Sequence, residues 1–260
     1  MKTIFPRKLT VERLAVEIHA DQTQLGRAAA LAVAASLREV IARQGQARVI
    51  LACAPSQSSF LSALAAPSLA GTIDWSRVTA FHMDEYVGLA ADAPSSFRRY
   101  LQEHLLAHVP LGRFHPLWAE SADLAAECAR YSDLLNERPI DLICLGIGEN
   151  GHVAFNDPPV ADFDDPATVK IVELDPACRR QQVNDGCFPS LAEVPRQALT
   201  LTVPVFRRAC RLSICVPGHR KAAAVRRALR DTITPACPAS ILRQHPNATL
   251  YLDAAAAAEL

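Results

Sequence analysis

The hydrophobic positions of this chain fall into short runs in which nearly every residue is apolar. Such runs are typical of parallel strands that are covered on both faces of a sheet. They predict buried strands at residues 47–52, 140–147, 198–203, 212–216 and 248–253. Weaker runs predict further strands at 78–86, 114–118 and 169–174. Strands that alternate with helical segments indicate an α/β fold with a mostly parallel sheet.

Helical spacing occupies most of the segments between these runs. Residues 21–46 are rich in alanine and leucine and contain no proline, and Asp21 stands where it can cap the first turn. Residues 122–138 are amphipathic and lead into the apolar run at 140–147. Shorter helices are predicted at 60–65, 95–107, 221–230 and 239–245, and in the alanine-rich tail.

Composition limits the possible classes of function. The chain has 260 residues, of which 50% are hydrophobic, so we expect one large domain spanning residues 1–260. Lys plus Arg and Asp plus Glu number 27 each. The chain therefore has no net positive charge to attract nucleic acid or an anionic membrane. A small-molecule ligand is expected instead. The sequence leaves open whether the protein forms a homo-oligomer.

Cysteine usage and the amino terminus indicate the compartment. The eight cysteines include no C-x-x-C pair, and several lie inside apolar runs. This usage is typical of buried thiols in a reducing environment, so neither disulfides nor a zinc site is expected. The stretch MKTIFPRKLTVERL lacks the apolar core of a signal peptide, and no window of the chain has the length of a membrane span. We expect a cytoplasmic protein.

The loop at residues 145–159, LGIGENGHVAFNDPP, concentrates glycines and ionisable groups directly after a buried strand. The carboxyl end of a parallel strand is where α/β proteins form ligand crevices. His152 is the residue of this loop whose ordinary pKa lies near neutrality, which makes it the leading candidate for acid/base chemistry. The alternative is a glycine turn in which His152 only bonds to backbone carbonyls.

Two other strand ends carry groups suited to an anion. Ser56, Ser58 and Ser59 follow the strand at 47–52 and precede a helix, whose free N–H groups attract negative charge. An ordinary serine cap would have the same sequence. Lys221 lies in the first helical turn after the strand at 212–216, where a cation opposes the helix dipole unless it binds an anion there.

The run VTAFHMDEY at residues 78–86 ends in two adjacent carboxylates, Asp84 and Glu85. Successive side chains of a regular strand point to opposite faces, so only one of the two is expected to reach a shared site. Further along, residues 160–166 are acidic and lack a regular pattern, and a strand-like run at 169–174 and a polar run at 178–186 follow. We interpret the segment 160–187 as a mobile lid over the crevice, although a surface excursion without function would look the same.

Several long motifs, in this order, resemble the glucosamine-6-phosphate deaminase family. They are FHMDEYVGL at 81–89, LGIGENGHVAFNDP at 145–158, PSLAEVPRQALTL at 189–201, GHRKA at 218–222 and ILRQHPNA at 241–248. The related 6-phosphogluconolactonases share the Gly-His element but differ after it. The resemblance implies a Rossmann-like, doubly wound, mostly parallel sheet with helices on both faces, a sugar phosphate as ligand, and neither a metal nor an organic cofactor.

The resemblance also implies a reaction and its residues. Glucosamine 6-phosphate would be converted to fructose 6-phosphate and ammonia by opening of the ring and transfer of a proton from C2 to C1. By similarity, Asp84 carries that proton, and His152 moves the ring-opening proton with support from Asn150 and Asp157. Binding of the substrate would fall to Ser56, Gln57, Ser58, Ser59, Glu85, Gly151 and Lys221.

Four features of the chain depart from the family pattern. Asn150 stands where aspartate is usual, so a neutral amide replaces the carboxylate that would favour protonated His152. On this reasoning an aspartate at position 150 should speed ring opening. Asp157 stands where glutamate is usual, and the turn at 53–55 lacks the expected glycine. A family arginine falls near Gly186, and Arg179 or Arg180 could replace it.

These departures keep two other functions open. A protein that has lost the ring-opening carboxylate but kept the fold would bind or sense a sugar phosphate without efficient turnover. A lactone hydrolase of the 6-phosphogluconolactonase type would use His152 to activate water. Asp84 and His152 together favour the deaminase.

Overall fold

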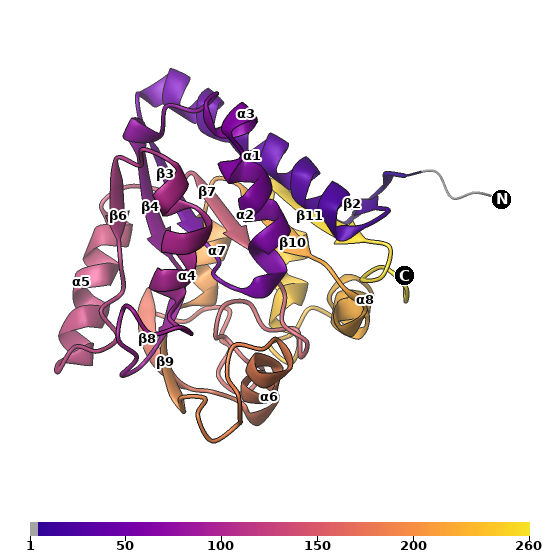
Figure 1. The fold of residues 1–260 in the computed structure, drawn as a ribbon. Coiled ribbons are helices and arrows are strands. Elements are labelled where there is room, and N and C mark those ends of the chain that lie inside the picture. The colour runs from indigo at the N-terminus through magenta and orange to yellow at the C-terminus, as the bar shows by residue number, and fades with distance from the viewer. Residues whose placement is uncertain (1–4) are drawn as a thin grey trace.

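A central sheet of eight strands organises the fold, in the order β1-β2-β11-β10-β7-β3-β4-β6. The computed structural model describes residues 5–260 (Figure 1); residues 1–4, where no signal peptide is expected, lie outside the described residues. All neighbouring strands pair in parallel except β1 and β2. The strands are β1 (Arg7–Val11), β2 (Leu14–His19), β3 (Ala47–Leu51), β4 (Val78–His82), β6 (Arg113–His115), β7 (Leu142–Leu145), β10 (Leu212–Val216) and β11 (Ala248–Asp253).

Eight α-helices and five short 3₁₀ helices connect the strands of the described chain. The α-helices are α1 (Gln22–Gln44), α2 (Ser58–Ala65), α3 (Pro67–Ala70), α4 (Phe97–His104), α5 (Leu124–Asn136), α6 (Pro176–Asn184), α7 (Val203–Arg208) and α8 (Ala222–Arg230). The 3₁₀ helices are η1 (Pro55–Gln57), η2 (Trp75–Arg77), η3 (Leu106–His108), η4 (His219–Lys221) and η5 (Pro238–Gln244). Asp21 caps α1 by accepting a hydrogen bond from the Gln24 backbone, as predicted.

Both faces of the central sheet are covered by helices. Alternate residues of β3 separate the two layers, since Val49 and Leu51 pack with α1 and α2 whereas Ile50 packs with α5 and α8. Figure 1 shows α1, α2 and α3 gathered on one side of the sheet. The arrangement confirms the predicted α/β class with a mostly parallel sheet, and it explains why the strands read as unbroken apolar runs.

A second sheet of three antiparallel strands, in the order β5-β9-β8, lies beside the carboxyl edge of the first. Its strands are β5 (Asp84–Tyr86), β9 (Gln197–Leu201) and β8 (Val169–Glu173). The prediction of one strand over residues 78–86 is therefore wrong, because the chain leaves the central sheet at Met83 and joins the small sheet at Asp84. The burial pattern does not reveal this change, since both halves of the run are largely buried.

Three other predictions are incomplete or wrong. The hairpin of β1 and β2 was not predicted, because residues 7–11 alternate between exposed and half-buried positions and form no apolar run. The polar run at 178–186 belongs mostly to a helix, α6. The alanine-rich tail forms turns at residues 254–259 in place of the predicted helix. Among the described residues, no helix is long and apolar enough to cross a membrane.

Candidate active site

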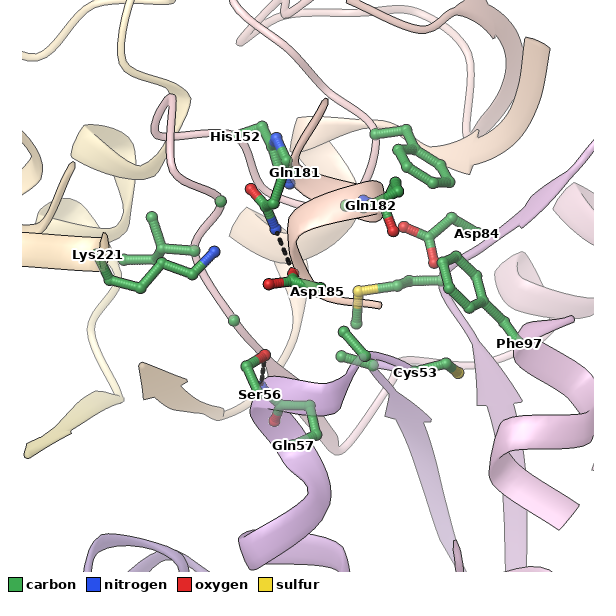
Figure 2. Close-up of a pocket in the computed structure, with 18 residues that line it drawn as sticks. Cys53, Ser56, Gln57, Asp84, Phe97, His152, Gln181, Gln182, Asp185 and Lys221 are labelled. Atoms are coloured by element: carbon green, nitrogen blue, oxygen red, sulfur yellow. Dashed lines mark hydrogen bonds between the residues drawn. The ribbon is translucent and has the colours of Figure 1, made fainter. Parts of the chain in front are cut away.

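A cavity of about 70 Å³ opens at the carboxyl ends of β3, β4, β7 and β10 (Figure 2). The order of the strands reverses between β3 and β7, and ligands of α/β proteins bind at such a switch point. Asp84, His152, Ser56, Gln57 and Lys221 line the cavity. The sequence predicted all five of these positions, which lie on four separate segments of the chain.

Asp84 faces the cavity from the first position of β5, where it pairs with Thr200 of β9. Its side chain is buried, and burial together with the neighbouring Glu85 carboxylate raises the pKa of Asp84 well above its ordinary value. A carboxyl group with a raised pKa takes up and releases a proton more readily near neutral pH. Asp84 is therefore suited to carry a proton.

Glu85 points away from the cavity, so its predicted role in substrate binding does not fit the structure. Its carboxylate accepts hydrogen bonds from the Ser96 hydroxyl at 2.9 Å and from the backbone N–H groups of Phe97 and Arg98, and it pairs with the Arg98 guanidinium at 3.2 Å. These contacts fix the first turn of α4. The physical reason is the alternation along β5, which turns neighbouring side chains to opposite faces.

His152 is held by a carboxylate on the side of its ring that faces away from the open space. Its Nδ1 lies 2.9 Å from Asp157 Oδ1, so Nε2 is the ring nitrogen left for a ligand. Burial raises the pKa of Asp157, but the contact with His152 and a hydrogen bond from Asn150 outweigh it, and the pKa lies below its ordinary value. Asp157 is therefore ionised at neutral pH, and its carboxylate holds the His152 ring in place through Nδ1.

Asn150 supports this pair without touching the imidazole. Its Nδ2 donates to Asp157 Oδ1 at 2.8 Å, and its Oδ1 accepts from the backbone N–H of His152 at 3.0 Å. The expectation that the change from aspartate at position 150 removes the negative neighbour of His152 is wrong, because Asp157 supplies that charge. Neither Asn150 nor Asp157 lines the cavity.

Two glycines of the loop leave room for neighbouring side chains. A Cβ at Gly148 would lie 2.2 Å from the His152 ring, so only glycine lets the imidazole lie against the loop. Gly151 has a positive φ of 91°, and a Cβ there would lie 2.8 Å from Cys237 Sγ. Gly151 does not line the cavity, which corrects its predicted role in substrate binding.

The turn after β3 brings only part of the predicted anion site to the cavity. Gln57 Nε2 donates to Ser56 Oγ at 3.2 Å and to the Cys215 carbonyl at 3.1 Å, and the Gln57 Oε1 atom is buried without a partner. Ser58 bonds to the Tyr100 hydroxyl at 2.8 Å, and neither Ser58 nor Ser59 lines the cavity. Both serines lie in the first turn of α2, directly after the 3₁₀ helix that faces the open space.

Lys221 reaches the cavity from the last position of η4, directly before α8. Burial lowers the pKa of Lys221, while the carboxylates of Asp185 and Glu149 act in the opposite direction. Those two carboxylates pair with Arg220, at 2.5 Å from Asp185 and 3.1 Å from Glu149. Asp185 also lines the cavity, so an acidic group lies near Lys221 in the same cavity (Figure 2).

Helix α6 supplies cavity residues that the sequence interpretation missed. Gln181, Gln182 and Asp185 line the cavity, and Gln182 accepts a hydrogen bond from the Tyr86 hydroxyl at 2.7 Å. The helix begins with Asp175, which caps it, and a proline at its first position. This Asp-Pro pair was the signal available in the sequence. Arg179 does not replace the family arginine, because it donates to the carbonyls of Leu191 and Val194.

One group of side chains in the described chain could in principle hold a metal ion. Ligand atoms of His152, Asp157 and Cys178 lie within 4.8 Å of one another. Burial raises the pKa of the Cys178 thiol well above its ordinary value, and a neutral thiol is a poor metal ligand. The contacts among these three residues are explained by hydrogen bonding around the Asp157 carboxylate.

The fold and the cavity define an α/β protein with an acid/base pair and a buried lysine at the carboxyl edge of its sheet. Residues 20–251 match the family described as glucosamine-6-phosphate isomerases/6-phosphogluconolactonase. The chain belongs to this family. This match agrees with the resemblance to glucosamine-6-phosphate deaminases that the sequence motifs indicate.

Individual relatives agree with this assignment. A glucosamine-6-phosphate deaminase of Lactobacillus delbrueckii subsp. bulgaricus is 35% identical over 192 residues, which cover 74% of this chain and 80% of the relative. Another, from an Exiguobacterium species, is 38% identical over 185 residues, or 71% of each chain. The structure of a monomeric glucosamine-6-phosphate deaminase superposes with a TM-score of 0.86 at 29% identity, covering 94% of this chain and 99% of that one.

A 6-phosphogluconolactonase from Shewanella baltica superposes with a TM-score of 0.74 at 21% identity, covering 96% of this chain and all of that one. At this level of identity the likeness concerns the fold alone. The family thus contains two chemistries on one fold, and the residues of the cavity must distinguish between them.

Proposed function

We propose that this protein is a glucosamine-6-phosphate deaminase, which converts glucosamine 6-phosphate to fructose 6-phosphate and ammonia. The observation that carries the proposal is the cavity that Asp84, His152 and Lys221 line together. Asp84 and His152 are groups for proton transfer, and Lys221 is a buried cation for a phosphate. The deaminases among the relatives are consistent with this chemistry.

The proposed reaction consists of proton transfers. His152 carries the proton of the C1 hydroxyl to the ring oxygen through Nε2, so that the C1–O5 bond breaks, while the Asp157 carboxylate holds the ring at Nδ1. Asp84 then takes the proton from C2 of the open chain, which gives an enolamine, and returns a proton to C1. Water adds at C2, and ammonia leaves as the ketone forms. Each positioned proton transfer typically contributes about 10²–10⁴-fold to the rate.

The phosphate is proposed to bind between Lys221 and the turn formed by Ser56 and Gln57. Both parts line the same cavity, and the Lys221 ammonium is buried there. A buried ammonium binds an anion more strongly than an exposed one, because water competes less for it. Asp84 and His152 would then act on the other end of the sugar, near C1 and C2.

We also propose that the segment 160–187 opens and closes over the cavity. The cavity has a volume of about 70 Å³. Pockets for small molecules usually measure roughly 300–1,000 Å³, so a hexose phosphate requires the covering residues to move apart. Gln181, Gln182 and Asp185 belong to this segment and line the cavity. Helix α6 is therefore the proposed moving element.

A protein that binds the sugar phosphate without turnover is the second candidate. The observation that favours it is the Asp185 carboxylate, which shares the cavity with Lys221 and opposes an incoming phosphate. A coupled assay of purified protein with glucosamine 6-phosphate, measuring ammonia and fructose 6-phosphate together, decides between the two. The deaminase predicts equal amounts of both products. Binding in calorimetry without either product would support the second candidate.

A further inference from the structure

Arg220 precedes Lys221 in η4 and joins three segments of the chain, although it does not itself line the cavity. Its guanidinium lies 2.5 Å from Asp185 Oδ1, 3.1 Å from Glu149 Oε1 and 3.1 Å from the carbonyl of Asn184. Asn184 and Asp185 form the carboxyl end of α6, and Glu149 belongs to the loop after β7. Arg220 therefore ties the proposed moving helix to the loop that carries His152.

The charges at this end of the cavity do not suit a phosphate dianion as they stand. Lys221 and Arg220 contribute two positive charges, and Asp185 and Glu149 contribute two negative charges. A dianion entering beside Lys221 would meet the Asp185 carboxylate, which lines the same cavity near the ammonium (Figure 2). Like charges in a partly buried site repel each other strongly.

Arg220 is the group that can resolve this conflict. Its side chain is 55% exposed, whereas that of Asp185 is 13% exposed, so the arginine can turn more freely than its partner. A guanidinium presents several N–H donors in a planar fork that fits phosphate as well as carboxylate. If Arg220 exchanges the Asp185 carboxylate for a phosphate, its positive charge stays paired with a negative one.

We propose that Arg220 is the second phosphate-binding cation of this protein and that the phosphate replaces Asp185 as its partner. The inference rests on the proposed function and deepens it by assigning the phosphate end. When the exchange takes place, the carboxyl end of α6 loses its ion pair to Arg220, and Asp185 can leave the cavity wall. Binding of the phosphate and movement of α6 are thereby coupled through one side chain.

The test measures binding without catalysis. Calorimetry with inorganic phosphate, with fructose 6-phosphate in the absence of ammonia, and with unphosphorylated fructose compares the parent protein with Arg220→Ala. The variant should bind both phosphate compounds roughly 10- to 100-fold more weakly, as expected for a lost hydrogen bond to a charged group, and should bind fructose unchanged. Arg226→Ala is the matched control, because Arg226 lies on α8 with carboxylate partners away from the cavity. It should bind like the parent.

The variant Asp185→Asn distinguishes partner exchange from a merely structural ion pair. Removing the competing carboxylate should strengthen binding of inorganic phosphate by about two- to fivefold, and the gain should disappear when Arg220→Ala is added. If Asp185→Asn instead weakens binding as Arg220→Ala does, the ion pair only supports the fold and the proposal is overturned. Unchanged phosphate affinity in Arg220→Ala overturns it as well.

The same measurements separate this proposal from the proposed function. A parent protein that produces ammonia and fructose 6-phosphate, together with an Arg220→Ala variant of parental phosphate affinity, refutes the role of Arg220 alone. A parent protein that binds the phosphate compounds and forms no product refutes the deaminase, while the opposite effects of the two variants would still support Arg220. A parent protein that binds no phosphate compound refutes both.

Discussion

The two ends of the cavity are built in different ways. At the His152 end, the functional groups are fixed by buried contacts, among them the Asp157 carboxylate and its hydrogen bond from Asn150. At the Lys221 end, an exposed arginine pairs with two carboxylates, and we propose that the phosphate replaces one of them, Asp185. The difference indicates that the groups for chemistry are positioned before the substrate arrives, whereas the phosphate end rearranges when it binds.

The largest expected effect lies at the fixed end. Asp84→Asn keeps the size of the side chain but removes its ability to carry a proton. We expect kcat to fall by about 10²–10⁴-fold in the coupled assay, with little change in the affinity for fructose 6-phosphate. Asp92→Asn, which changes an exposed carboxylate outside the cavity, is the control and should keep parental kcat. Equal loss of binding and turnover in Asp84→Asn would mean that Asp84 holds the substrate.

Lys221→Ala tests the adjustable end. It should weaken binding of glucosamine 6-phosphate by roughly 1.5–3 kcal/mol, because a charge-assisted hydrogen bond in a buried site is lost. Binding of glucosamine, which has no phosphate, should stay the same. Calorimetry with both compounds makes the comparison, and an equal loss for the two would place the phosphate elsewhere.

Asp157→Asn sharpens the role assigned to the His152 pair. The amide keeps a partner near Nδ1 but removes the negative charge that contacts this nitrogen. We expect kcat to fall by about tenfold, which is less than the loss expected on removal of His152 itself. The slowed step should be ring opening. Measuring turnover at known fractions of open-chain substrate tests this step. If the variant is slowed equally on open-chain substrate, Asp157 does not act in ring opening.

Asn150→Asp should have a smaller effect. The sequence alone predicts that this change speeds ring opening, and the structure predicts that it does not. A carboxylate at position 150 would face the Asp157 carboxylate at the place of the present 2.8 Å hydrogen bond. The variant should lose about 1 kcal/mol of stability, the usual value of such a bond, and should turn over no faster than the parent. Chemical denaturation and the coupled assay measure both. A faster and equally stable variant would show that position 150 acts on His152 directly.

The smallest expected effect concerns stability and pH. Burial raises the pKa of Asp84 well above its ordinary value, so the folded state holds this proton more tightly than the unfolded state does. The parent protein should therefore lose stability relative to Asp84→Asn as pH rises above about 4, where an unfolded aspartate ionises. Thermal unfolding of both proteins across pH should show a Tm difference that grows with pH. A constant difference would contradict a raised pKa.

The sequence predicted the central sheet well because its strands are covered on both faces. Runs such as 47–52 and 212–216 are apolar at nearly every position, and the loops after them carry Ser56, His152 and Lys221. Side chains that meet at the carboxyl edge could thus be found without coordinates. The alternation of a strand also predicted that only one of Asp84 and Glu85 would reach the site.

Features that depend on packing between distant segments were not predictable in the same way. The exit of the chain from the central sheet at Met83 depends on pairing with β9, more than a hundred residues later. The contact of Asp157 with His152 and the ion pairs of Arg220 depend on how loops approach one another in space. Polar character made α6 look like irregular chain, although its capping residues were present in the sequence.

Solvent deuterium incorporation tests the central claim, that Asp84 carries the proton between C2 and C1, most directly. Purified parent protein and Asp84→Asn are incubated with glucosamine 6-phosphate in deuterated water, and the fructose 6-phosphate is analysed at C1. The parent should place deuterium at C1, and Asp84→Asn should place none while still binding fructose 6-phosphate. Incorporation by the variant at near the parental rate would contradict this account.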